Sequence, residues 1–414
     1  MFIQLHTLTS YHASLINRDE TGSAKRITFG GAPRIRISSQ CLKRHWREHF
    51  MADEKFASAV RSCNVFEERV LQLAVEKGAD EEGARIVLRA VVGTVIKGAF
   101  PKEKSTGPLS LKTAQAVLIG EREAECLAAF VAHQLARWKN AEDKADRLVF
   151  DNDPAKAVEQ VEKFLKKLFK GSEEDDAKGT KVTKSNLAAL LGYNGEPGLM
   201  SGVEAAMFGR FVTSDLMART DSAVSVAHAF TTHSAVPEID FFSVVDDLAS
   251  AEQMGASMVG ESELNGGLFY GYVVIDVPHL VSNLTGCRPQ DWREQDLEST
   301  RATIAKLIEL IATVSPGAKT GSTAPFAYAS VLVAEVGDKA PTALSNAFLK
   351  PVKGTELLDV SVQAMGNHMT AIEKMYGARG TRHVMCDPSV ELPGLTDSTK
   401  SLPEVISSVL ADLG

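Results

Sequence analysis

Residues 30–50 read GGAPRIRISSQCLKRHWREHF and contain the clearest structural pattern of the chain. Within this stretch, residues 34–37 alternate polar and apolar side chains, which predicts a half-buried strand. Ser38 or Ser39 follows as a suitable N-cap for a helix. At about 100° per residue, the helix would carry three large apolar side chains on one face: Leu42, Trp46 and Phe50. The stretch therefore predicts a strand that runs directly into an amphipathic helix.

The same region carries positive charge in an otherwise acidic protein. Between Thr21 and Arg47 there are seven basic residues and no Asp or Glu, whereas the whole chain has a net charge of −8. The seven are Lys25, Arg26, Arg34, Arg36, Lys43, Arg44 and Arg47. The last three flank the apolar face of the predicted helix, whose N-terminus adds N–H groups that suit phosphate. A local anion site is predicted, and the alternative is a solvated basic face without a partner.

Composition is typical of a soluble globular protein of two or three domains, with 414 residues and 44% hydrophobic residues. The N-terminus has no signal-peptide pattern, and no run of about eighteen uncharged apolar residues occurs, so a cytoplasmic protein is expected. Five scattered cysteines are expected to be reduced thiols. Two histidine pairs, His45 with His49 and His228 with His233, lack a nearby third ligand. We therefore expect no metal and no cofactor.

After the basic stretch, the hydrophobic pattern predicts a large helical insertion. Apolar side chains recur at the 3.6-residue period through most of residues 52–202. Lysines are frequent in its second half, where they are usually a solvated face and less often a nucleic-acid contact. They include Lys163, Lys166, Lys167, Lys170, Lys181 and Lys184.

From Val203 the period changes to two, and three neighbouring strands are predicted. They are VEAAMFGRFVT (203–213), SAVSVAHAFTTH (222–233) and GLFYGYVVIDV (267–277). The loop before the last strand, about 234–267, contains the apolar run FFSVV, residues 241–245. No Lys or Arg occurs between Arg219 and Arg288, whereas nine acidic residues do. This segment is therefore acidic, whereas the stretch from Thr21 to Arg47 is basic.

The last third of the chain predicts helices and strands in alternation. A helix at 298–314 precedes a Gly- and Ser-rich loop, PGAKTGSTAP (316–325), and a buried strand, FAYASVLVAEV (326–336). A helix around 355–376, a short strand at 383–385 and a terminal helix follow. The order strand, helix, strands, helix, strand is that of ferredoxin-like and RNA-recognition folds. The predicted fold class is α+β.

Six motifs together resemble a known family. In chain order they are NRDETGSAKRITFGGAPRIRISSQCLKRHWR, MFGRFVTSD, SVAHAFTTH, PEIDFFSVVDDL, GGLFYGYVVIDV and PGAKTGSTAPFAY. They are similar to the CasC-type backbone subunit of the type I-E CRISPR Cascade complex, in the RAMP superfamily. The resemblance spans residues 2 to about 335, whereas the helical region and the C-terminal third match only in character.

The resemblance implies an RRM-like, ferredoxin-like palm formed by residues 1–51 and 203–414. Helical fingers would be inserted at 52–202, and an extended thumb loop at about 234–267. Several copies would stack head to tail along a CRISPR RNA and present it for pairing with target DNA, beside other Cascade subunits, in antiviral defence. Base pairing then reads the sequence, so the protein needs phosphate contacts and an apolar wedge that displaces bases. No catalysis is implied.

The resemblance also implies roles for individual residues. The RNA-binding residues would be Lys25, Arg26, Lys43, Arg44, Arg47, Phe211, Phe241, Phe242, Val259 and Lys319. The target DNA would meet finger lysines among Lys163, Lys166, Lys167, Lys170, Lys181 and Lys184. The charge contrast adds a hypothesis: the acidic segment, including Asp246 and Asp247, contacts the basic stretch of the next copy, which would propagate a filament.

Three alternatives stay open from the sequence. Backbone subunits of type III CRISPR complexes resemble this fold and cut RNA with an Asp in the loop after the first strand, where Asp19 lies here. A scaffold that binds only protein is a second alternative. The run FFSVV also has a purely structural interpretation, as a buried strand.

Overall fold

The computed structural model describes the chain except for residues 54–55, 57–58, 97, 102–106, 144–146, 150–152, 171–201, 210–220, 237, 246–255, 318–319, 391 and 394–398. The chain divides into two compact units. The sheet unit comprises Met1–Phe50, Val224–Val277 and Thr300–Gly414. The helical unit comprises Met51–Ala223 and Pro278–Ser299.

The sheet unit is organised around β1 (Phe2–Ser14). This strand pairs antiparallel with β9 (Ala256–Asp276) on one side and with β10 (Ala329–Gly337) on the other. The sheet order is β11-β10-β1-β9-β7-β3-β2, and β6 also pairs with β9. The remaining strands are β2 (Arg26–Phe29), β3 (Ala32–Ile37), β6 (Val224–Val226), β7 (Ala229–Thr231) and β11 (Thr381–Cys386). The central order β10-β1-β9-β7 is the ferredoxin-like one, so the predicted α+β fold is confirmed.

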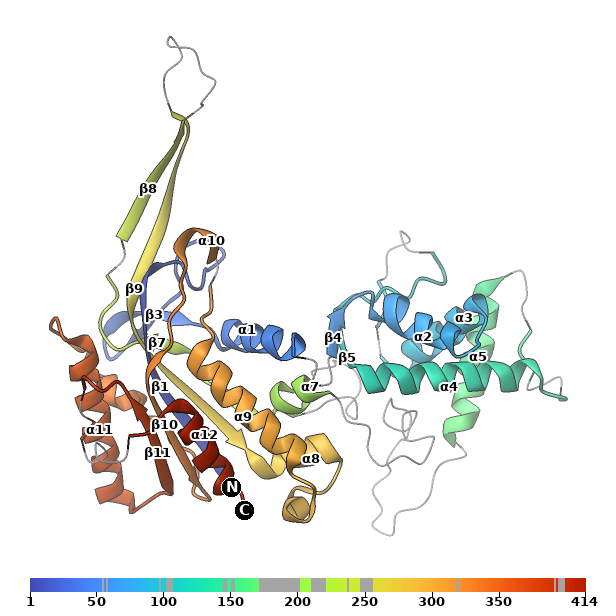
Figure 1. Cartoon of the computed structure of the whole chain (residues 1–414). Helices are drawn as coiled ribbons and strands as arrows, with labels where there is room; N and C mark the ends of the chain where they lie inside the picture. Colours follow the sequence, from blue (N-terminus) through green and yellow to red (C-terminus); the bar gives the residue numbers. More distant parts are fainter. Residues whose placement is uncertain are drawn as a thin grey trace. The chain divides into compact units, whose positions relative to one another are not determined.

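Helices cover both faces of this sheet (Figure 1). Because side chains of a strand alternate between faces, Leu5 and Leu8 of β1 enter different layers. Leu5 lines a small cavity with Leu42 and Trp46, on the face covered by α1 and α9. Leu8 packs in the core cluster that contains Met365 of α11. The helices and short turns are α1 (Ser39–Met51), α9 (Glu298–Thr313), α10 (Thr320–Thr323), η4 (Ser345–Phe348), α11 (Leu357–Tyr376) and α12 (Leu402–Ala411).

A hairpin extends from the sheet. Its strands are β8 (Glu238–Val245) and the first half of β9, paired antiparallel from Glu238 opposite Leu264 to Val245 opposite Ala256. The second half of β9 lies between β1 and β7 in the sheet, so one long strand belongs to both structures (Figure 1). The run FFSVV is thus part of a two-stranded ribbon and not a buried strand in the sheet.

The helical unit has its own apolar core, formed mainly by α3, α4 and α5. The elements are β4 (Ala59–Ser62), η1 (Phe66–Val70), α2 (Leu71–Glu76), α3 (Glu81–Val95), β5 (Val117–Gly120), α4 (Glu121–Lys139), α5 (Pro154–Lys170), α7 (Val203–Phe208), α8 (Val277–Thr285) and η3 (Pro289–Glu294). Among the described residues, no helix is both long and apolar enough to cross a membrane.

Two expectations about residues after Val203 were wrong. The predicted strand at 203–213 begins as the helix α7, whose Glu, Ala and Met residues are good helix formers. The palm expected at 203–414 also loses 203–223 and 278–299 to the helical unit. The amide of Asn283 in α8 explains part of this change, because it donates to the carbonyls of Ala206 and Asp221, each at 2.9 Å.

Candidate nucleic-acid interface

The basic stretch begins with a strand and a capped helix, as the sequence predicted. The backbone N–H of Cys41 donates to Ser38 Oγ at 3.3 Å, so Ser38 caps α1. The N–H of Ser38 in turn donates to Asn17 Oδ1 at 2.9 Å, which fixes the preceding loop against the helix start. The predicted apolar face is confirmed, since the buried residues of α1 are Leu42, Trp46 and Phe50.

Arg34 does not belong to the exposed positive surface. Its side chain is 0% exposed. Its guanidinium donates to the carbonyls of Thr231 and Thr232 at 2.8 and 2.7 Å, and to the carbonyl of Phe348 at 2.8 Å. The cation therefore holds β3, β7 and η4 together and is a structural residue, although the sequence grouped it with the anion site.

Three cations of α1 lie at different depths along one flank. Arg44 is exposed and forms an ion pair with Glu48 at 2.8 Å, one helical turn further on. Lys43 and Arg47 are half-buried. Burial lowers the pKa of the Lys43 ammonium, because desolvation penalises its charged form. A neighbouring anion lowers the cost of burying such a charge.

The loop before β2 brings a further cation to the same place. The Asp19 carboxylate accepts hydrogen bonds from the Thr21 and Ser23 N–H groups and from the Thr21 hydroxyl. The Thr21 hydroxyl bond contributes most to holding the Asp19 pKa below its usual range. This turn places Lys25 near α1: burial raises the pKa of the Cys41 thiol, and the charge of Lys25 opposes that rise.

Arg26, which the resemblance assigned to RNA, has an ion-pair partner within the chain. Its guanidinium forms an ion pair with Glu263 of β9, at the base of the hairpin. Glu263 also accepts a hydrogen bond from the Asn265 amide at 3.0 Å. Arg26 therefore links β2 to the hairpin in this structure. No local pattern predicts this pairing, because the two residues are 237 positions apart.

The Gly- and Ser-rich loop lies between α1 and the end of β1. The N–H of Gly317 donates to His45 Nε2 at 3.4 Å, and His12 Nε2 contacts the Thr323 carbonyl at 2.9 Å. The Gly317 contact places the loop on the His45 side of α1, beside Cys41 and across the apolar face from Lys43 and Arg47. Lys319 itself lies outside the described residues.

The segment after this loop was expected to be a buried strand, and the structure differs. β10 begins only at Ala329. Phe326 and Tyr328 precede it and are 71% and 73% exposed. Sequence reasoning missed them because FAYASVLVAEV is apolar throughout and predicts a single strand. The only signal for the exposed residues is that Phe and Tyr alternate with Ala at the start of this run.

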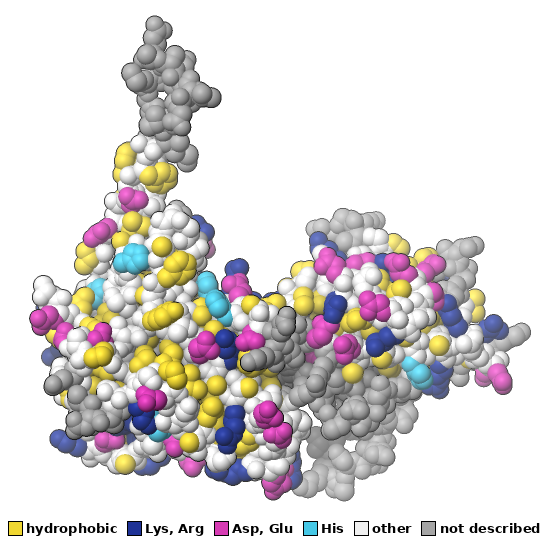
Figure 2. All heavy atoms as spheres, in the orientation of Figure 1, with side chains coloured by type: hydrophobic (Ala, Val, Ile, Leu, Met, Phe, Trp, Pro, Cys, Tyr) yellow, Lys and Arg dark blue, Asp and Glu magenta, His cyan; other side chains and the backbone are white. Residues whose placement is uncertain are grey.

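The hairpin combines exposed apolar side chains with acidic ones (Figure 2). Phe241 is 64% exposed and lies opposite Glu261, whereas Ile239 lies opposite Glu263 on the same face. Phe242 points to the other face and packs across Gly260, where a Cβ atom would collide with its ring. The side chain of Val259 and all of Phe211, Asp246 and Asp247 lie outside the described residues.

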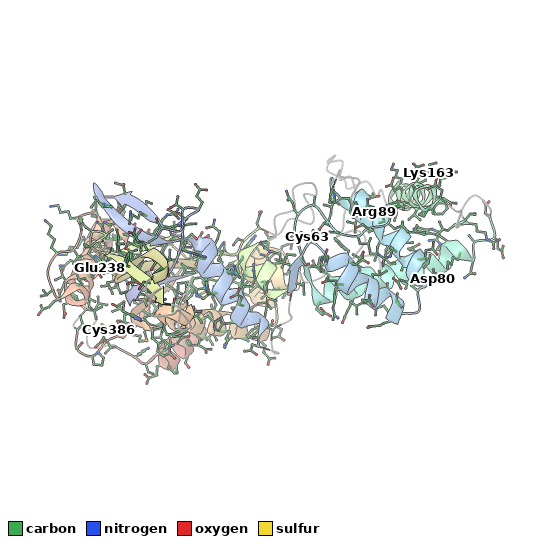
Figure 3. The ribbon with its side chains drawn as sticks, turned by 90° about the horizontal axis from the view of Figure 1, so that it is seen from above. Cys63, Asp80, Arg89, Lys163, Glu238 and Cys386 are labelled. Atoms are coloured by element: carbon green, nitrogen blue, oxygen red, sulfur yellow. The ribbon has the colours of Figure 1, made fainter. Side chains whose placement is uncertain are left out.

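In the helical unit, α5 carries the described lysines. Lys163 and Lys166 are exposed, whereas Phe164 and Leu165 between them are buried (Figure 3). Lys167 and Lys170 belong to α5 by their backbone, but the structure does not describe their side chains. Lys181 and Lys184 lie outside the described residues.

Histidines and cysteines form no metal site among the described residues, where no group of three or more potential ligands occurs. His45 and His49 contact carbonyls of their own helix, at 2.8 and 2.9 Å. His228 Nδ1 contacts Arg36 at 2.8 Å, and His233 Nε2 accepts from the Leu268 N–H at 3.3 Å. All five cysteines are free thiols.

Comparison with known proteins supports the resemblance seen in the motifs. No curated protein sequence matches the chain. A solved chain described as "CRISPR RNA-guided surveillance complex, pre-nicking" has a TM-score of 0.75 at 22% identity, with 100% of both chains covered. Another, described as "CRISPR RNA-guided surveillance complex", has a TM-score of 0.64 at 20% identity, again over 100% of both chains. The predicted resemblance to a Cascade backbone-type protein is thus confirmed. The family model of the CT1975-like protein (Cas_CT1975) matches residues 3–408, so the chain belongs to this family.

Proposed function

We propose that the chain is a guide-RNA-binding backbone subunit of a type I-E Cascade complex. One observation carries this proposal: three segments far apart in the sequence meet around the first two turns of α1, whose exposed flank carries its cations. The three segments are the turn held by Asp19, the start of α1 and the Gly- and Ser-rich loop. The flank offers cations and backbone N–H groups, which suit a phosphate chain better than base edges.

In this proposal, Lys25, Lys43, Arg44 and Arg47 contact the guide backbone. The resemblance also assigned Arg26, but its ion pair with Glu263 favours a role in holding the hairpin. Guide bases would be displaced by the hairpin, whose exposed Phe241 suits an apolar wedge. Unstacking one base costs a few kcal/mol, which such a wedge offsets by burying its own apolar surface.

Assembly along the guide and binding of target DNA are further parts of the proposal. The hairpin carries exposed Glu238 and Asp240 and no Lys or Arg, so its charge complements the basic flank of another copy. A contact between two different surfaces propagates instead of closing. Lys163 and Lys166 are candidates for the DNA contact.

The proposal includes no cleavage. Asp19 is engaged in its own turn, which supports a structural role for this carboxylate over the metal-dependent ribonuclease alternative. Cytoplasmic location and a role in antiviral defence follow from the proposed complex.

The test is purification of the full chain co-expressed with its CRISPR RNA. We expect bound RNA of defined length and large assemblies for the natural protein, and neither for Lys43→Glu combined with Arg47→Glu. Lys163→Glu combined with Lys166→Glu is the matched control, which should keep the guide and lose only target DNA.

Circular dichroism establishes that each variant is folded. Retention of RNA by the folded α1 variant would refute the phosphate contacts. Adding complementary RNA and Mg²⁺ to the same complex should give no cleavage. Cleavage that disappears in Asp19→Ala would replace the proposal with the ribonuclease.

A further inference from the structure

Phe326 and Tyr328 are exposed aromatic residues in a segment with a fixed backbone. Their side chains are 71% and 73% exposed. Among the described residues, neither ring stacks on another aromatic ring or lies under a cation. Two such rings in one short segment form an exposed apolar patch, a feature that marks interaction sites.

The backbone between the two rings is held extended. The Ser315 hydroxyl donates to the carbonyl of Ala327 at 2.8 Å and accepts from the N–H of the same residue, also at 2.8 Å. One hydroxyl can bridge both groups only when they point to the same side, as they do in an extended residue. Side chains two positions apart on an extended chain leave it on the same face, so Phe326 and Tyr328 project together, at right angles to these hydrogen bonds.

The spacing of the rings fits a flat ligand. Two residues of extended chain span about 6.6–6.8 Å, which is twice the roughly 3.4 Å between stacked bases. A single aromatic base between the rings would contact one ring on each of its faces. Stacking of this kind is independent of base identity, since every base has a π-face.

The segment continues from the loop that contacts α1. Ser315 holds Ala327, and Gly317, two residues after Ser315, donates to His45 of α1. The rings are thus connected through one short loop to the side of α1 that carries Cys41 and His45, where the charges of Lys25 and Arg44 act on the Cys41 thiol. A nucleotide chain at the start of α1 has its bases available for stacking at the rings.

We infer that Phe326 and Tyr328 form a stacking site for one unpaired base of single-stranded RNA. This inference rests on the proposed function, because it needs the guide backbone on the α1 flank. It assigns a receiving site for a base that the hairpin has displaced. The stack is local to one copy and requires no second chain.

The test uses RNA-free full-length protein and a hexauridylate with one internal 2-aminopurine, whose fluorescence is quenched by stacking. Natural protein should bind and quench it. Phe326→Ala combined with Tyr328→Ala should lose the quenching and about tenfold in affinity. Phe326→Leu combined with Tyr328→Leu keeps apolar surface without rings, and the same loss is expected. Tyr376→Ala is the matched control, because Tyr376 is 70% exposed at the end of α11.

Each outcome decides the matter. Unchanged quenching in the Ala or the Leu variant overturns the stacking site while leaving the proposed function intact. Normal RNA binding with reduced self-association in RNA-free sedimentation would assign the rings to a second copy and also overturn it. If the natural protein binds no RNA, or the Lys43→Glu, Arg47→Glu variant binds RNA equally well, the proposed phosphate contacts are refuted, and the stacking site that rests on them is refuted with them.

Discussion

The start of α1 and the β8–β9 hairpin are the two parts of the sheet unit assigned to the guide, and they differ in both charge and support. The helix rests on the sheet through buried Trp46 and Phe50, and its cations lie at the edge of that packing. The hairpin has exposed Phe241 and acidic neighbours, with no sheet beneath it. We propose two tasks from this difference: the helix would attract the phosphate chain, whereas the hairpin would repel phosphate and contact apolar bases.

The largest expected effect comes from removing the buried side chain that supports the basic region. Arg34→Ala should destabilise the sheet unit by about 3–5 kcal/mol, because three buried carbonyls lose a charged donor. Urea unfolding followed by circular dichroism measures this change. Arg36→Ala, on the same strand but only half-buried, should cost about 1 kcal/mol or less. Equal losses in the two variants would contradict the structural role of Arg34.

Lowering the pH should destabilise the sheet, because β1 contains a buried histidine. The described part of the hairpin has no histidine and should lack this effect. Burial lowers the pKa of His6 from 6.5 to about 3, with smaller contributions from the charges of Arg382 and Arg379. As the pH falls, the unfolded chain therefore takes up a proton on His6 at a higher pH than the folded chain does. The stability from neutral His6 is complete above about pH 6.5 and declines by about 1.4 kcal/mol per pH unit towards pH 3.

Unfolding free energies between pH 7 and pH 5 measure this effect. His6→Gln should show a shallower decline than the natural protein. The control is His12→Gln, which changes an exposed histidine on the same strand and should keep the natural slope. An unchanged slope in His6→Gln would contradict the prediction.

The smallest effect separates the two faces of the hairpin. Phe242→Ala should cost about 0.5–1 kcal/mol, because its ring packs across Gly260. Faster hydrogen exchange at the amides of Val259 and Glu261 measures the loss. Phe241→Ala should leave exchange unchanged and weaken the bound RNA, since that ring is exposed. The reverse pattern would assign the wedge to Phe242.

Local patterns in the sequence predicted the elements, and long-range contacts decided the roles of side chains. The face formed by Leu42, Trp46 and Phe50 follows from helical periodicity alone. The burial of Arg34 does not, because its acceptors lie about 200 and 314 residues away. Likewise, nothing near Arg26 in the sequence indicated Glu263.

Short segments were the other source of error. VEAAMFGRFVT has too few residues to distinguish a half-buried strand from a helix, and helix propensity prevailed in its first half. The pattern of FAYASVLVAEV predicts one strand, because apolar content cannot show where pairing begins. Pairing of β10 with β1 begins at Ala329, opposite Thr9, which leaves the two rings before it exposed.

The length of β9, 21 residues, limits which insertions the β8–β9 hairpin can accept. The strand is registered against β1 up to Gly267 opposite Tyr11, and Gly267 has φ +147° with no room for a Cβ beside His233. Beyond this point β1 pairs once more, at Ser14 opposite Asn265, and Arg26 of β2 forms an ion pair with Glu263, so the ribbon is held mainly by its pairing with β8. Side chains alternate, so a single-residue insertion would exchange the faces of Phe241 and Phe242, whereas two residues would restore them. Natural variation in hairpin length is therefore expected in even steps.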